Sequence, residues 1–306
     1  MKKFIIALIF LVSCGGDLSI VRKTSVEEKW FLPYVDGMNG VENIAFDNDF
    51  MYVTGLDGVL YKIESSDNPY RGKIVLKKKI GVMCLGLVAA DNGFLYVGVQ
   101  EDADSFPKII RLNKDFEGAV PLTDGIEGLN GLEIDRNGRL YYSWSNMSFI
   151  SPKGILYRAD VNNVESFKNP EIIIDDAGLL NGFALTPDEG SIYFTETTGS
   201  LHSIDLDSKK RSIVYTPSGF FQILDDVCVD DAGTVWLACN SKSLIIAIKQ
   251  DSTVTAYQTG DLRVPSSLAF SESEKFNKKF LYITEFGLKP RSLTMNGRGV
   301  WILPLE

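Results

Sequence analysis

The stretch LDDVCVDDAGTVWLA, residues 224–238, contains a short apolar alternation, a turn with Asp and Gly, and a strand-like run of Val, Trp, Leu and Ala. The same order of features recurs in five other stretches, at residues 41–55, 84–99, 129–143, 180–196 and 265–285. The residue that opens the first strand of each copy recurs at intervals of 41 to 51 residues, close to the length of one propeller blade. Further strand-like segments, such as GVLYKIE at 58–64 and KIIRLNK at 108–114, lie between the copies. The sequence therefore predicts an all-β fold, a six-bladed β-propeller with four-stranded antiparallel blades.

The two ends of the predicted propeller, residues 28–306, carry segments suited to closing the ring. GVWILPL at 299–305 supplies a third strand for the last blade, and EKWFLPYV at 28–35 supplies its outermost fourth strand. Pairing of these two segments removes a free strand edge on which other chains could add. We therefore expect the last blade to contain strands from both ends of the chain.

The chain begins with MKKFIIALIFLVSC, residues 1–14, in which two lysines precede an apolar run and a cysteine. The run is too short for a permanent membrane span and is typical of an export signal. Residues 11–14, LVSC, resemble the bacterial lipoprotein cleavage box, which makes Cys14 the lipid-modified N-terminus. Residues 15–27 then form a flexible tether. This predicts an exported bacterial lipoprotein, anchored to a membrane at the periplasmic face or the cell surface; an ordinary signal peptide cleaved nearby is the alternative.

The composition of the whole chain limits the possible partners. The chain is 45% hydrophobic and 23% charged, and its net charge is −9. An acidic balance without a basic stripe argues against nucleic acid as a partner, and we expect a monomer. Besides Cys14 there are three cysteines, Cys84, Cys228 and Cys239, an odd number that does not indicate a disulfide framework. We expect them to be mostly buried, and the sequence leaves open whether two of them form a bridge.

In the common register, the six strand-opening residues face one end of the central channel. They are Glu42, Leu85, Asn130, Asn181, Asp225 and Ser266. Two carboxylates and two carboxamides are oxygen donors that suit a hard divalent cation, above all Ca²⁺, although Zn²⁺ and Mn²⁺ remain alternatives. Asn and Asp are also common in turns, so each residue alone has a structural interpretation. Their shared register favours a metal site.

At these residues the chain resembles the gluconolactonase, senescence marker protein and luciferin-regenerating enzyme family of six-bladed propellers. The matching text is VENIAF, LNGLEID, LNGFALTPDEGSIYFTET and LDDVCVDDAGTVWLA. The resemblance implies that Glu42, Asn181 and Asp225 are metal ligands and that Asn130 is the substrate-contacting or water-bridged asparagine. Adjacent Asp225 and Asp226 are similar to the arrangement in the related paraoxonases, and residues 138–160 resemble the strictosidine-synthase-like branch.

This resemblance implies a metal-dependent hydrolase of lactones or related esters. Ca²⁺ would stabilise the oxyanion, and Asp225 would take a proton from the attacking water, with Asn130 as the second catalytic residue. The chain has neither a G-x-S-x-G elbow nor a Walker-type loop. We expect His202 to be a half-exposed sheet residue, and Glu196 and Glu285 to be solvated turn residues outside the site. The alternative is a non-catalytic propeller that binds a ligand or a protein partner.

Overall fold

The structure, a computed structural model, describes residues 24–28, 31–146, 148, 150–197, 199–217, 222–289, 294–295 and 299–305. The predicted export signal with Cys14 lies outside these residues, as does most of the tether predicted at 15–27. The last residues of that tether belong to a strand, β1 (Thr24–Glu28). None of the helices in the described part of the chain is long and apolar enough to cross a membrane.

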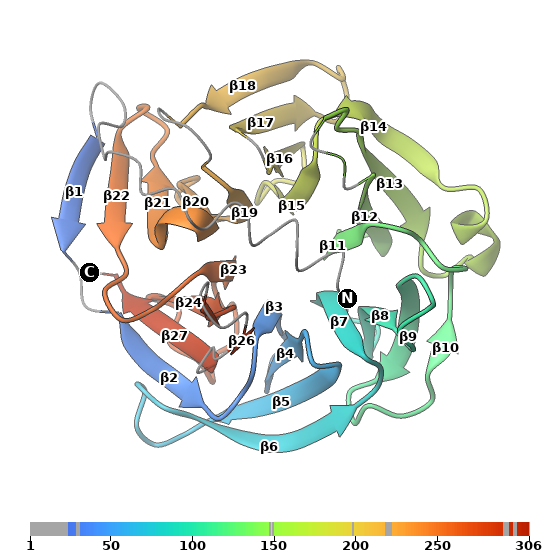
Figure 1. The fold of residues 1–306 in the computed structure, drawn as a ribbon, viewed down its shortest axis with the longest axis horizontal. Helices are drawn as coiled ribbons and strands as arrows, with labels where there is room; N and C mark the ends of the chain where they lie inside the picture. Colours follow the sequence, from blue (N-terminus) through green and yellow to red (C-terminus); the bar gives the residue numbers. More distant parts are fainter. Residues whose placement is uncertain are drawn as a thin grey trace.

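Six antiparallel sheets surround a central channel, which confirms the predicted six-bladed propeller (Figure 1). Blade 1 contains β3 (Val41–Phe46), β4 (Met51–Gly55), β5 (Val59–Ser65) and β6 (Gly72–Lys79). Blade 2 contains β7 (Met83–Ala89), β8 (Phe94–Gln100), β9 (Lys108–Asn113) and β10 (Val120–Pro121). Blade 3 contains β11 (Leu129–Ile134), β12 (Arg139–Ser145), β13 (Gly154–Asp160) and β14 (Glu171–Ala177), with the short 3₁₀ helix η1 (Val164–Phe167) before β14.

The remaining three blades complete the ring. Blade 4 contains β15 (Leu180–Leu185), β16 (Ser191–Glu196), β17 (Ser200–Asp205) and β18 (Arg211–Tyr215). Blade 5 contains β19 (Leu224–Val229), β20 (Val235–Cys239), β21 (Leu244–Ile248) and β22 (Val254–Gln258), with η2 (Asn240–Lys242) after β20, and β1 adds to it as a parallel fifth strand. Blade 6 contains β23 (Pro265–Ala269), β24 (Phe280–Glu285), β27 (Gly299–Pro304) and β2 (Leu32–Asp36). A two-stranded sheet of β25 (Leu288–Lys289) and β26 (Thr294–Met295) lies between β24 and β27 in the chain.

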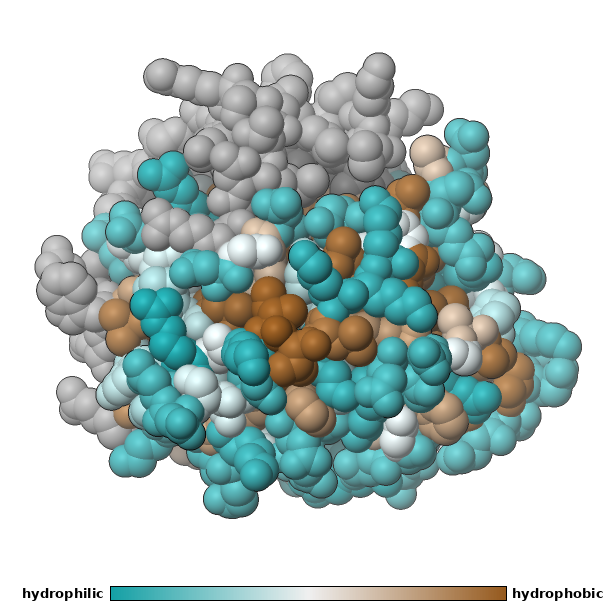
Figure 2. Space-filling view, turned by 90° about the horizontal axis from the view of Figure 1, so that it is seen from below, coloured by the Kyte–Doolittle hydropathy of each residue, from teal (hydrophilic) through white to brown (hydrophobic). Residues whose placement is uncertain are grey.

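The ring closes through strands from both ends of the chain, as the sequence predicts. β2 pairs antiparallel with β27, so the outermost strand of blade 6 comes from the beginning of the chain. The side of the disc where β2 and β6 lie is mainly hydrophilic, with hydrophobic residues gathered near its centre and smaller groups toward its edges (Figure 2). Lys73, Lys77 and Lys79 are exposed on the edge strand β6. Lysines at such positions oppose pairing with a further strand.

The Asp that follows the first strand of a blade explains much of the sequence repeat. In blade 1, Asp47 accepts a backbone N–H from Phe50 at 2.7 Å and the hydroxyl of Tyr52 at 2.9 Å. In blade 5, Asp230 accepts the N–H of Thr234 at 2.8 Å and the indole N–H of Trp236 at 2.9 Å. The acidic side chain therefore fixes both the turn and the aromatic residue of the second strand. This is why the repeat combines an Asp turn with an aromatic strand.

Candidate functional site

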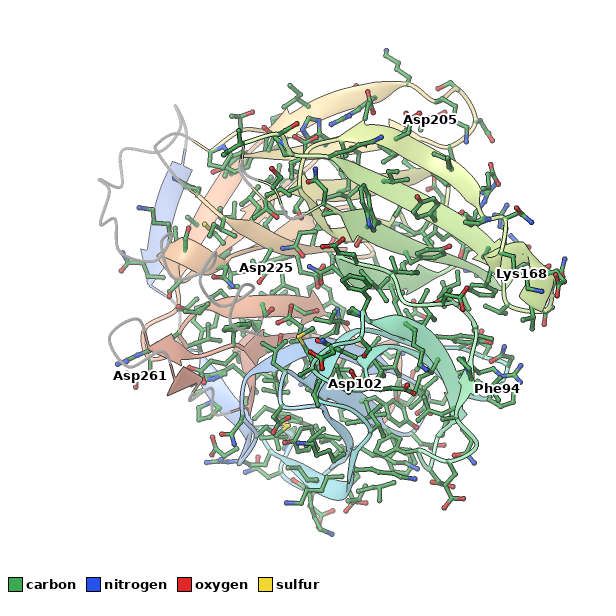
Figure 3. All side chains as sticks on the ribbon, turned by 45° about the vertical axis from the view of Figure 1, so that its right-hand side comes forward. Phe94, Asp102, Lys168, Asp205, Asp225 and Asp261 are labelled. Atoms are coloured by element: carbon green, nitrogen blue, oxygen red, sulfur yellow. The ribbon has the colours of Figure 1, made fainter. Side chains whose placement is uncertain are left out.

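The innermost strand of every blade has a register break at the same place. In each blade, two consecutive residues lie between successive paired positions, as Asp225 and Asp226 do between Leu224 and Val227. Such a bulge takes two residues out of the regular ladder and redirects their side chains. The first bulge residues are the six that the sequence register predicts at the end of the channel. Asp225 lies near the middle of the ring of blades, whereas Lys168 and Asp205 lie at its periphery (Figure 3).

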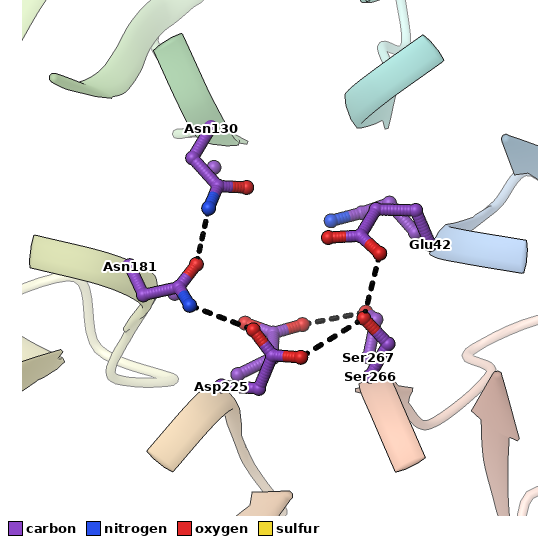
Figure 4. A pocket seen from close by; sticks show the side chains of 10 residues that line it. Glu42, Asn130, Asn181, Asp225, Ser266 and Ser267 are labelled. Atoms are coloured by element: carbon purple, nitrogen blue, oxygen red, sulfur yellow. Dashed lines mark hydrogen bonds between the residues drawn. The ribbon is translucent and has the colours of Figure 1, made fainter. Parts of the chain in front are cut away.

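Across this end of the channel, hydrogen bonds connect side chains from five successive blades, which are blades 3, 4, 5, 6 and 1 (Figure 4). Asn130 Nδ2 donates to Asn181 Oδ1, and Asn181 Nδ2 donates to Asp225 Oδ1 at 2.7 Å. Ser266 Oγ lies 3.1 Å from Asp225 Oδ2 and 2.9 Å from Glu42 Oε2. The structure thus brings together Glu42, Asn130, Asn181 and Asp225, the four residues singled out from the sequence, and adds Ser266 as a bridge between the two carboxylates.

Asn240 is a member of this network that the sequence reasoning missed. Its Nδ2 donates to Asp225 Oδ2 at 2.8 Å, and the residue is 4% exposed. Its Oδ1 is buried and has no hydrogen-bond partner among the described residues. Because Asn240 follows the second strand of blade 5, at the start of η2, the repeat register of the first strands does not point to it.

The second bulge residues of blades 1, 3, 4, 5 and 6 line the same cavity as the ring. Asp226 accepts the N–H of Val227 at 2.9 Å and the hydroxyl of Ser267 at 2.5 Å. Blade 4 has Gly182 at this position, and a Cβ there would lie 2.2 Å from Asp226 Oδ1. Only glycine therefore fits between Asp226 and blade 4, which accounts for the Asn-Gly pair at 181–182.

Hydroxyl side chains hold the ring residues in place from behind. Thr195 Oγ1 lies 3.1 Å from the N–H of Gly182 and 3.0 Å from the carbonyl oxygen of Asp225 in the next blade. A Ser or Thr at the equivalent position of three other blades makes the same two contacts; these residues are Thr54, Ser143 and Thr284. The sequence carries this signal as a hydroxyl residue two positions after an aromatic one in the second strand, in YVT, YYS, YFT and YIT.

The site concentrates acidic groups in a buried environment. Burial raises the pKa of Glu42 well above its ordinary value, and the charge of Asp225 raises it further. Burial also raises the pKa of Asp225 to about 6 and that of Asp226 to about 7, although hydrogen bonds to both carboxyl groups oppose the shift. A positive charge among these groups would favour their ionised forms.

The donor set fits a hard cation. The space left between the side chains is about 10 Å³, close to the smallest volume that holds one water molecule. The described residues contain no group of three or more His, Cys, Asp or Glu side chains that could hold a metal ion. A cation at this place would therefore also need the amide oxygens of Asn130, Asn181 or Asn240. Carboxylate and amide oxygens without nitrogen or sulfur donors suit Ca²⁺ better than Zn²⁺.

Three residues outside the ring differ from the expectations drawn from the sequence. His202 is 7% exposed and stacks on Phe194, so the expectation of a half-exposed residue is wrong. Glu285 is 3% exposed and accepts hydrogen bonds from the N–H of Arg263 and the indole of Trp301, so it is not a solvated turn residue. Glu196 is half-buried, and its carboxylate accepts hydrogen bonds from Arg211 and from the N–H of Gly178. Packing between neighbouring strands and loops removes His202 and Glu285 from water.

The described cysteines form no bridge. Cys84, Cys228 and Cys239 are all free, and Cys84 and Cys239 are buried. Burial raises the pKa of the Cys84 and Cys239 thiols to about 12. A thiol with such a pKa is a poor nucleophile at neutral pH.

Comparison with known proteins places the chain in a family and agrees with the fold. Residues 47–286 match a family described as the SMP-30/Gluconolactonase/LRE-like region. The chain is 22% identical over 267 residues to the lactonase drp35 of Staphylococcus haemolyticus, which covers 79% of this chain and 75% of that protein.

Solved structures with the same fold include a gluconolactonase from Xanthomonas campestris, at 17% identity and a TM-score of 0.68, with 90% of this chain and 89% of that chain covered. They also include regucalcin from Agrobacterium tumefaciens, described as a calcium-binding protein, at 14% identity and a TM-score of 0.69, with 94% and 96% of the two chains covered. At these identities the structural likeness shows the fold alone.

Proposed function

Because the chain belongs to the SMP-30/gluconolactonase/LRE-like family, we propose that it is a cation-dependent hydrolase of lactones or related esters. The observation that carries this proposal is the convergence of Glu42, Asn130, Asn181 and Asp225 at one end of the channel, joined by hydrogen bonds. The likeness to a lactonase supports the reaction class, and a calcium-binding protein with the same fold supports the choice of cation.

Glu42, Asn181 and Asp225 are the residues that would hold the cation, with Asn130 beside them. When bound, Ca²⁺ supplies positive charge that stabilises the negative charge developing on the carbonyl oxygen of a lactone or ester. The carboxylates of Glu42 and Asp225, with Asp226 next to them, supply negative charge, and the amides supply further oxygen ligands. Asn240, whose buried Oδ1 has no partner in the described part of the chain, is an additional oxygen ligand next to Asp225.

Asp225 is the residue that we propose as the general base. Hydrogen bonds from Asn181, Asn240 and Ser266 fix the orientation of its carboxylate. A water molecule attacks the carbonyl carbon while Asp225 takes its proton; the ring or ester C–O bond then breaks, and the departing alcohol oxygen receives a proton. Asn130, two ring positions from Asp225 and hydrogen-bonded to Asn181, contacts the substrate.

The proposed location at a membrane rests on the export signal and Cys14 in residues 1–14. A lipid on Cys14 would leave nine residues before β1 begins at Thr24, so the propeller would stay close to the membrane that holds the anchor. We propose that the protein acts as a monomer at the cell envelope on a small lactone or ester.

The test is an assay of the purified protein on aldonolactones, acyl-homoserine lactones and aryl esters with calcium present. We expect hydrolysis of at least one class well above the rate in buffer. Failure with all three classes would favour a propeller that binds a ligand without turning it over.

A further inference from the structure

One of the six ring positions is apolar. Blade 2 carries Leu85 where the other blades carry an oxygen-bearing side chain, and Leu85 is 2% exposed. We infer that the side of the site nearest blade 2 is an apolar subsite, which selects lactones or esters with an alkyl or aryl substituent over polyhydroxylated sugar lactones. This inference rests on the proposed function.

Leu85 belongs to a separate small cluster of hydrophobic side chains. Leu56, Met83 and Leu85 are buried together, and the partly buried Phe286 packs against them. The cluster draws on three blades, because Leu56 follows the second strand of blade 1, Met83 and Leu85 lie in β7 of blade 2, and Phe286 follows the second strand of blade 6. The cluster therefore forms where three blades meet. It is separate from the larger hydrophobic clusters of the core.

Strand register places this cluster at the same end of the channel as the polar ring. Leu56 directly follows Gly55, which pairs with Val41, the neighbour of Glu42. Phe286 directly follows Glu285, which pairs with Pro265, the neighbour of Ser266.

The cluster therefore borders the ring at blade 2, between the positions of Glu42 in blade 1 and Asn130 in blade 3. The five other ring positions carry polar side chains. The ring consequently has one apolar sector, at blade 2, beside polar groups able to hold the reacting carbonyl group.

This division has a direct effect on substrate choice. Hydroxyl groups of a sugar lactone placed against Leu85 and Phe286 would lose hydrogen bonds to water without gaining new ones. An alkyl or aryl group would instead gain from leaving water. A single methylene in a hydrophobic pocket changes kcat/KM by roughly 10- to 200-fold, so a chain of several carbons gives a large preference.

The experiment compares three lactones of the same ring size with calcium present. They are δ-valerolactone without a substituent, δ-decalactone with an alkyl chain, and glucono-δ-lactone with hydroxyl groups. We expect kcat/KM of the wild-type protein to be at least tenfold higher for δ-decalactone than for either of the other two. We expect Leu85→Asn, which introduces the side chain found at the ring position of blades 3 and 4, to reduce this ratio at least tenfold, mainly through KM.

Two further variants distinguish a loss of the apolar subsite from a loss of folding. Phe286→Ser changes the partly buried member of the cluster and should also reduce the ratio. Ile213→Asn alters a residue that is 67% exposed on β18 and should leave the ratio unchanged. Melting curves of all variants identify any that fail to fold.

The possible failures can be told apart. A preference for glucono-δ-lactone, or an unchanged ratio in both cluster variants, overturns the apolar subsite and leaves the lactonase proposal standing. If no lactone is hydrolysed, the proposed function fails and calorimetry decides the subsite. Tighter binding of δ-decalactone than of δ-valerolactone, weakened by Leu85→Asn, then supports it, and equal binding of the two overturns it.

Discussion

The side chain of Asn181 donates a hydrogen bond from Nδ2 to Oδ1 of Asp225 at 2.7 Å, although the two residues are 44 positions apart and lie in neighbouring blades. The same two blades are joined again behind the site, where Thr195 bonds both the N–H of Gly182 and the carbonyl oxygen of Asp225. The position of Asp225 therefore depends on blade 4 as well as on its own strand. Contacts between blades, more than any single blade, set the geometry of the site.

Replacement of Thr195 tests this dependence. Thr195→Val keeps the shape of the side chain but leaves a buried N–H and a buried carbonyl without their partner, at a cost of about 1–3 kcal/mol. We expect a melting temperature several degrees lower, since for a domain of this size each kcal/mol corresponds to roughly 2–4 °C. Thr195→Ser keeps the hydroxyl and should lie much closer to wild type. Equal melting temperatures for the two variants would show that the hydroxyl does not hold the blades together.

Removal of divalent cations should destabilise the protein. An ion that binds only the folded state adds about 2.7 kcal/mol at a hundredfold excess over Kd. We expect a chelator to lower the melting temperature and Ca²⁺ to restore it, as measured by differential scanning fluorimetry. A melting curve that does not respond to chelator, Ca²⁺, Mg²⁺, Mn²⁺ or Zn²⁺ would leave the four ring residues as structural turn residues.

His202 gives a pH dependence that is separate from the site. Burial lowers the pKa of His202; the charge of Arg211 lowers it further, and the charges of Glu196 and Asp176 oppose this. Because its pKa in the folded state lies below the unfolded value of about 6.5, the unfolded state binds more protons as the pH falls through that range. The associated stability is therefore present above about pH 6.5 and is lost as the pH falls toward the lowered pKa.

Urea unfolding of wild type and His202→Gln checks this sign. We expect the free energy of unfolding to fall more between about pH 7.5 and 5.5 in wild type than in the variant, which has no titrating group at this position. If both proteins lose the same amount, His202 does not contribute to the acid sensitivity of the fold.

The lipid anchor depends on one sulfur atom. Attachment requires the thiol of Cys14, so Cys14→Ser should convert a membrane-extracted protein into a soluble or unprocessed one. Partitioning between detergent and aqueous phases measures this change. Equal partitioning of variant and wild type would contradict the lipoprotein assignment.

The repeat in the sequence predicts the propeller and its ring because side-chain direction in a strand follows position. Once the six first strands are aligned, Glu42, Asn181 and Asp225 must face the same end of the channel, whatever loops separate them. The Asp turns at Asp47 and Asp230 repeat for a local reason, since each fixes its own hairpin. Features of this kind depend on residues of a single blade and can therefore be recognised in its amino-acid sequence.

Asn240 and the burial of His202 and Glu285 could not be predicted in this way. Asn240 reaches Asp225 from η2, outside the aligned strands, and its contact depends on how that short helix turns back over blade 5. His202 contacts Arg211 on the adjacent strand of its blade, and Glu285 contacts Trp301 on another strand of blade 6. Packing of this kind depends on the assembled tertiary structure, and the alternation of one strand does not encode it.

The most direct test of the account is the turnover of Asp225→Asn at saturating calcium, on the lactone that wild type hydrolyses best. The amide oxygen retains some affinity for the cation, but the side chain no longer accepts a proton from water. We predict that kcat falls on the order of 10² to 10⁴-fold and that further calcium does not restore it. A variant as active as wild type under these conditions would contradict the assignment of Asp225 as the general base and the hydrolytic mechanism built on it.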